Sequence, residues 1–195
     1  MIDTKAEPLL ASQITGFSIP VAARTALLFR TLAVVAATLA ALLPLAVVLY
    51  WLLIERDDVL RQMGFAPEIL PAFDPLLRFA AILITVLTVA PLAWGLIRLQ
   101  VCFSQFAQGR PFAARGIAGL RDFAAGMGLA VIAKPVGFTL LVLLLSWNAP
   151  AGMRQLAISI DSDTLIMALF AATVASLAWA MEKAAAIAEE NSQFI

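Results

Sequence analysis

Residues 32–54 read LAVVAATLAALLPLAVVLYWLLI and carry no charged side chain. As an α-helix that rises about 1.5 Å per residue, this stretch is long enough to cross a hydrocarbon core of about 30 Å. Three further stretches are similarly apolar, namely residues 79–97, residues 123–147, which are interrupted by one charge, and residues 164–181. None of them alternates polar and apolar residues as the strands of an outer-membrane barrel do. The sequence therefore predicts an all-α polytopic membrane protein whose four transmembrane helices form a bundle.

The amino-acid composition agrees with this fold class. Of the 195 residues, 63% are hydrophobic and 13% are charged, and the mean hydropathy is +0.96, whereas soluble domains are about half apolar and about a quarter charged. The chain has no histidine and a single cysteine, Cys102. It therefore lacks the commonest general base and metal ligand and cannot form an intramolecular disulfide. With no nucleophile–base pattern either, the sequence predicts neither an enzyme nor a bound metal or cofactor.

Basic residues predict the orientation of the four spans. One side carries eight Lys and Arg residues: Lys5, Arg24, Arg30, Arg98, Arg110, Arg115, Arg121 and Lys183. The other side carries four: Arg56, Arg61, Arg78 and Arg154. The positive-inside rule places the richer side in the cytoplasm. We expect a multi-pass protein of the bacterial inner membrane, with a cytoplasmic segment 1–31, a transmembrane domain 32–187 and a cytoplasmic tail 188–195.

Lys134 is the one ionisable residue deep inside a predicted span. It lies 11 residues after Phe123, or about 16 Å along a helix, close to the middle of the membrane. A lysine at that depth costs about 2.5–3.5 kcal/mol on insertion scales. It would serve a proton relay, an anion contact or a switch, or it would snorkel or bond carbonyl groups freed by Pro135. No Asp or Glu is expected at the same depth in the other spans.

The two loops of the outer side carry acidic residues. In residues 55–74 these are separated by prolines that prevent one long helix, and a solvated loop is favoured over a cation site. In the second loop, Leu156, Ile158 and Ile160 alternate with small residues, which is typical of a short strand or an interfacial segment. For the acidic residues that follow, capping of the last helix by Ser162 or Asp163 is favoured over metal binding.

Two segments of the cytoplasmic side are candidates for docking a partner. The loop between the second and third spans offers Arg110, Arg115 and Arg121, after a turn that Gly109 permits. The tail offers Glu189, Glu190, Asn191 and Phe194, where acidic residues precede an apolar end. Such a tail suits a protein better than a lipid surface, which favours Lys and Arg. The alternative is a helix end that frays at the lipid surface.

The same two segments resemble a known family. Gly109-Arg110-Pro111-Phe112 with Leu120-Arg121, the Ile158-Ser159-Ile160 stretch, and a tail with Glu189-Glu190-Asn191 before Phe194-Ile195 are similar to the bacterial domain of unknown function 2975 family. Its members are small four-span inner-membrane proteins without an established biochemical activity. They are often encoded beside a small helix-turn-helix regulator. The resemblance implies a membrane partner of a cytoplasmic DNA-binding protein.

Two function classes follow from these features. The favoured one is a non-enzymatic membrane sensor or anchor for a cytoplasmic partner such as that regulator, with no direct contact to nucleic acid, because the chain has no net charge. The alternative is a small transporter or channel that works as a homo-oligomer, in which Lys134 has a role. Genes next to the one for this chain would discriminate between them.

Overall fold

The computed structural model describes residues 23–70, 73–150 and 153–192. In this part of the chain, all regular structure is helical, in five elements: α2 (Ala23–Leu53), α3 (Arg56–Met63), α4 (Pro75–Ala107), α5 (Ala114–Leu145) and α6 (Ser162–Ser192). Four of them, α2, α4, α5 and α6, are long and apolar enough to cross a membrane. The prediction of an all-α protein with four membrane helices packed together is confirmed.

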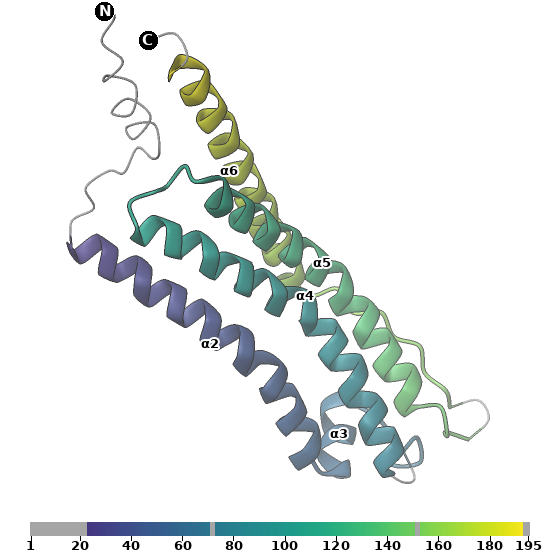
Figure 1. Cartoon of the computed structure of the whole chain (residues 1–195). Helices are drawn as coiled ribbons and strands as arrows, with labels where there is room; N and C mark the ends of the chain where they lie inside the picture. The colour runs from purple at the N-terminus through teal and green to yellow at the C-terminus, as the bar shows by residue number, and fades with distance from the viewer. Residues whose placement is uncertain (1–22, 71–72, 151–152, 193–195) are drawn as a thin grey trace, which may run out of the picture.

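The four long helices lie side by side and pack in chain order (Figure 1). Helix α2 packs on α4, α4 packs on α5, and α5 packs on α6. The beginning of α2 and the end of α6 lie at one end of the bundle, and the short helix α3 lies at the other. We call these the terminal end and the α3 end.

Helices α4 and α5 approach each other closely because glycines face their contact. A Cβ built on Gly126 would lie 2.6 Å from the carbonyl oxygen of Pro91, and one on Gly119 would lie 2.5 Å from that of Arg98. No side chain fits at either position without movement of a backbone. Small residues let helices approach in lipid, where van der Waals packing holds them together. This contact makes α4 and α5 the rigid centre of the bundle.

Residues 55–70 form a helix and a turn rather than an irregular loop, although their acidic side chains Glu55, Asp57, Asp58 and Glu68 are exposed, in agreement with the prediction of solvation. Helix α3 and the turn after it bury five apolar side chains against the ends of α4 and α5: Val59, Leu60, Phe65, Ile69 and Leu70. Gly64 ends α3 in the left-handed conformation, with φ of 67°, which glycine adopts without steric cost. The segment forms a compact cap because its apolar residues outweigh the acidic ones that suggested solvation.

The helices are longer than the apolar stretches predicted to span the membrane. Helix α4 continues past Ile97 to Ala107, and α5 begins at Ala114, before Phe123. Helix α6 continues past Met181 to Ser192. At about 1.5 Å per residue, each extension adds about 13–16 Å of helix. Helix α2 likewise begins at Ala23, nine residues before Leu32. All four extensions lie at the terminal end, so the helices continue there beyond the predicted apolar stretches.

Residues 153–161, which we call the strap, connect the α3 end to the start of α6. They form neither helix nor strand, so Leu156, Ile158 and Ile160 do not make the short strand suggested by their alternation. The strap runs back along α5, and α6 starts well inside the bundle rather than at the α3 end (Figure 1). This stagger of α6 determines the site described next.

Candidate functional site

Lys134 and Asp161 form an ion pair that the sequence did not predict. The Nζ atom of Lys134 lies 2.9 Å from Oδ1 and 2.7 Å from Oδ2 of Asp161. No acidic residue was expected at the depth of Lys134 in the other spans, and the partner comes instead from the segment that precedes the fourth span. Asp161 reaches that depth because the strap folds back along α5 instead of staying outside the apolar region. The side chains of Lys134 and Asp161 are 42% and 46% exposed on the surface of the bundle. The cation thus has its counter-ion, which offsets part of the cost of holding it in hydrocarbon.

Asp161 also caps helix α6. Its Oδ1 accepts a hydrogen bond of 2.9 Å from the backbone N–H of Thr164 and a second one from the Thr164 hydroxyl. Thr164 is 4% exposed, whereas Ser162 and Asp163 are exposed. The N-cap is therefore Asp161 and not Ser162 or Asp163, as the sequence suggested. One carboxylate satisfies an orphan donor of α6 and binds the cation of α5 at the same time.

Two hydroxyl groups, one in α5 and one directly after it, hold the rest of the strap. The Oγ1 of Thr139 donates to the carbonyl oxygen of Ala157 at 3.0 Å. The Oγ of Ser146 donates to the carbonyl oxygen of Gln155 at 3.2 Å and accepts from its backbone N–H at 3.3 Å. Ser146 is fully buried. Polar side chains within and directly after an otherwise apolar helix are the sequence signal from which these contacts could have been predicted.

A second ion pair ties α4 to α5 nearer the terminal end. Both Nε and Nη2 of Arg98 lie 2.7 Å from Oδ2 of Asp122. Arg121 lies 3.9 Å from the other oxygen of Asp122, which is a weak contact. Asp122 was not among the residues predicted from the sequence. A signal was present, because Asp122 directly precedes one apolar stretch and Arg98 directly follows another.

The predicted docking residues lie on the projecting helix ends as far as the structure describes them. Gly109 adopts φ of 73° in the turn between α4 and α5, and the N–H of Arg110 closes that turn on the carbonyl oxygen of Gln105 at 3.1 Å. Arg110, Arg115 and Arg121 are exposed, as is Glu190 on α6. The side chains of Glu189 and Asn191, and the whole of Phe194, lie outside the described residues.

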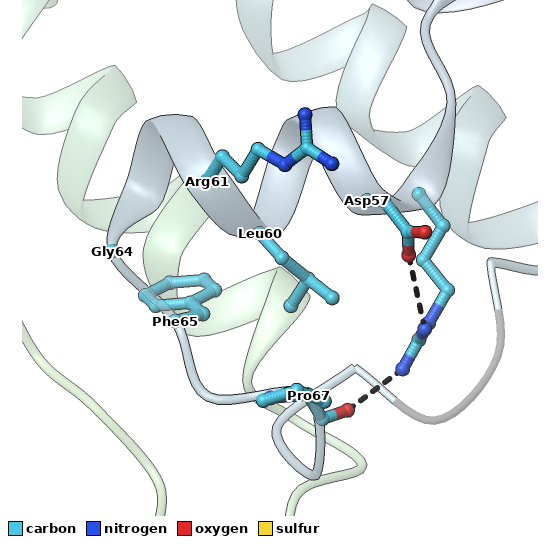
Figure 2. A pocket seen from close by; sticks show the side chains of 7 residues that line it. Asp57, Leu60, Arg61, Gly64, Phe65 and Pro67 are labelled. Atoms are coloured by element: carbon cyan, nitrogen blue, oxygen red, sulfur yellow. Dashed lines mark hydrogen bonds and ion pairs between the residues drawn. The ribbon is translucent and has the colours of Figure 1, made fainter.

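The α3 end carries a shallow hollow of about 390 Å³, which Figure 2 shows from close by. It is lined by Arg56, Asp57, Leu60, Arg61, Gly64, Phe65 and Pro67. Arg56 donates to the carbonyl oxygens of Leu70 at 2.6 Å and Pro67 at 2.7 Å, and lies 3.3 Å from Asp57. The guanidinium of Arg56 is therefore engaged in holding the cap. Of the two arginines that line the hollow, only the exposed Arg61 is not engaged in this way.

Arg78 holds the cap from the other side. Its guanidinium donates to the carbonyl oxygens of Trp51 and Leu52, in the last turn of α2, and of Ile54 directly after it. It also lies 4.6 Å from the centre of the Phe73 ring. Carbonyl groups at a helix C-terminus lack partners within the helix and attract cations. Arg56 and Arg78 thus both support the fold of this end.

Comparisons with protein-family models, with curated proteins and with solved structures find no match to this chain. Within the described residues, no group of three or more Cys, Asp or Glu side chains is placed to hold a metal ion. Two features then remain for a functional argument. They are the partly exposed Lys134–Asp161 pair between α5 and the start of α6 and the helix ends that project from the bundle.

Proposed function

We propose that this chain is a multi-pass protein of the bacterial inner membrane that binds a cytoplasmic protein through its terminal end. The observation that carries the proposal is the projection of α4, α5 and α6 beyond their apolar stretches. A helix that served only to cross the membrane would end near the headgroups. Helices that continue together for about 13–16 Å, as α4, α5, α6 and the start of α2 do, would form a surface outside the lipid.

The charges of this surface support a protein partner on the cytoplasmic side. Exposed Arg110 and Arg115 lie at the α4–α5 turn, and exposed Glu190 lies on α6. Surfaces with both signs of charge select partners by electrostatic complementarity. The excess of Lys and Arg at the terminal end favours a cytoplasmic location for it. The resemblance to the domain of unknown function 2975 family favours a small helix-turn-helix regulator as the partner, so that the membrane protein acts as its sensor or anchor.

A binding measurement with purified components tests this proposal. The protein is reconstituted in lipid nanodiscs, and the regulator encoded beside its gene is titrated onto it. We expect saturable binding to the full-length protein, and binding reduced by at least tenfold, about 1.4 kcal/mol, after deletion of residues 189–195 or after Arg110→Glu with Arg115→Glu. Arg154→Glu, at the α3 end, is the matched control and should bind as the full-length protein does. Absence of binding to the full-length protein would refute the proposal.

One observation favours a second candidate, a small oligomeric transporter. Helix α6 starts beside Lys134, in the middle of α5, after the non-helical strap. Interrupted helices with charged groups at mid-membrane are typical of transporter substrate sites. Against this reading, the oxygens of Asp161 and the ammonium of Lys134 are directed at each other. Transport would show itself as flux across proteoliposomes that Lys134→Gln abolishes.

A further inference from the structure

Charged groups lie exposed in an apolar part of the bundle, where α5 meets the start of α6. Between Asp122 and its end at Leu145, helix α5 carries no charged residue other than Lys134. Lys134 therefore lies about 16–18 Å from either limit of this stretch. The side chains of Lys134 and Asp161 are nevertheless 42% and 46% exposed. Lipid tails offer no hydrogen bond at this depth, and charged groups there normally face protein or water.

The ion pair keeps unused hydrogen-bonding capacity on its exposed side. An ammonium group has three donors, and a carboxylate oxygen accepts more than one hydrogen bond. Within the described residues, Nζ of Lys134 donates only to the two oxygens of Asp161, which leaves one donor. There Oδ2 of Asp161 accepts from Lys134 alone, whereas Oδ1 also accepts from Thr164. One donor and one acceptor thus remain for a group outside the chain.

Helix α6 carries two rows of residues that run along it from the ion pair. In one row every fourth residue is small, namely Ala168, Ala172 and Ser176. In the adjacent row Leu165 and Leu169 follow Asp161 with the same spacing. Both leucines are exposed, by 65% and 71%, as are Ala172 and Ser176. Residues four apart are neighbours on one face of a helix, so small and large rows lie side by side. We call this the two-row face of α6.

We propose that a second copy of this chain covers the two-row face, so that two α6 helices pack side by side and the two Lys134–Asp161 pairs meet between them. The copies are related by a two-fold axis along the membrane normal, because the bias of basic residues gives all copies one orientation. The large row of one α6 then packs against the small row of the other. Small residues let membrane helices approach closely, and van der Waals contact holds them together in lipid.

The charges of the ion pair complement themselves under this symmetry. Lys134 and Asp161 are exposed to similar extents, so the ammonium and the carboxylate lie side by side and neither covers the other. A two-fold axis in front of them reverses their order in the second copy. The ammonium of Lys134 then faces the partner's Asp161, and the remaining donor of each Nζ meets the remaining acceptor of each Oδ2. A lipid tail or an apolar helix supplies neither group.

The dimer brings two terminal ends next to each other. Helix-turn-helix regulators commonly act as dimers with a two-fold axis of their own, and two adjacent docking surfaces match that symmetry. This consequence rests on the proposed function. The dimer itself does not, because it follows from the ion pair and the two-row face within the membrane.

Disulfide formation in cell membranes tests the contact between the two α6 helices. In a Cys102→Ala background, oxidation should link Ala172→Cys in the small row into a dimer, because close helices bring the Cα atoms within the roughly 7 Å that a disulfide spans. Phe170→Cys is the matched control. Phe170 is 53% exposed on the same helix, but it lies two positions away and therefore on another face, so this variant should stay monomeric. Equal cross-linking at the two positions, no cross-linking, or linkage of Ala172→Cys to a different protein would overturn the proposal.

The strength of association in lipid tests the ion pairs. Purified protein is reconstituted in vesicles without any other protein, and energy transfer between labelled copies reports the dimer fraction as the protein is diluted with lipid. Ala172→Leu fills the small row, and Lys134→Gln removes the ammonium while Asp161 still caps α6. Each should weaken association by about tenfold or more, whereas Phe170→Leu should associate as the unmodified protein does. A monomer at every dilution, or undiminished association of Lys134→Gln, would overturn the proposal, whether or not a regulator binds.

Discussion

The Nζ atom of Lys134 lies 2.7 Å from Oδ2 of Asp161, and this contact joins the middle of α5 to the first turn of α6. The two residues are separated by the end of α5 and the whole strap. The pair therefore determines both where α6 starts and where the strap runs. Because the same carboxylate caps α6, a change at either residue affects the helix as well as the ion pair.

The two residues of this pair should depend on each other for stability. Lys134→Leu removes a charge from the membrane interior but leaves the carboxylate of Asp161 without its cation, so we expect a lower unfolding temperature in detergent. Adding Asp161→Asn keeps a capping oxygen and removes the unpaired charge, so the double variant should regain most of the loss. Independent, additive effects of the two substitutions would show that the residues do not interact.

The close contact of α4 with α5 should not tolerate a methyl group. Gly126→Ala places a Cβ 2.6 Å from the carbonyl oxygen of Pro91 and 2.9 Å from the Cα of Gly95, and overpacking of this kind costs about 1–3 kcal/mol. The matched control is Gly128→Ala in the same helix, where nothing lies within 4 Å of the added Cβ. There the gain in helix propensity should stabilise by about 0.5–1 kcal/mol. Equal unfolding free energies for the two variants would contradict the packing described.

Arg78 should stabilise the α3 end more than any exposed arginine there. Its removal in Arg78→Ala leaves the carbonyl groups of Trp51, Leu52 and Ile54 without their donor, at a cost of about 1.5–3 kcal/mol for hydrogen bonds to a charged group. Arg61 has an 81% exposed side chain and only a 3.9 Å contact with Asp58. Arg61→Ala should therefore change the free energy of unfolding by less than about 0.5 kcal/mol. The comparison is made by thermal unfolding in one detergent.

Sequence reasoning was sufficient for the helices and insufficient for their register. Residues 32–54, 79–97 and 123–147 were assigned from the absence of charge, and each lies largely within a helix because lipid demands long apolar segments. The same rule placed Asp161 in the loop before residues 164–181 and gave it no partner. The hydrophobic pattern of one helix does not specify how far along the bundle axis that helix lies relative to its neighbour. The pairing of Lys134 with Asp161 was invisible for that reason.

The α3 end was misjudged for a different reason. Acidic residues and prolines in 55–74 indicated solvation, yet Phe65, Ile69 and Leu70 are buried. Their burial depends on Arg56 and Arg78, which bind backbone carbonyl groups far along the chain. A contact between a side chain and a carbonyl group that is distant along the chain leaves no local pattern in the sequence. The candidate residues Arg110, Arg115 and Glu190 remain predictions for partner binding, since exposure alone does not assign them a role.

The orientation of the bundle is the claim on which the proposed function depends, and reporter fusions measure it directly. A reporter fused after Ile195 should be active in the cytoplasm, and one inserted near Pro67, at the α3 end, should be active only outside it. This is the result expected if the basic terminal end faces the cytoplasm. The opposite pattern, with Pro67 inside and Ile195 outside, would place the projecting ends of α4, α5 and α6 away from any cytoplasmic partner and would contradict the proposed function.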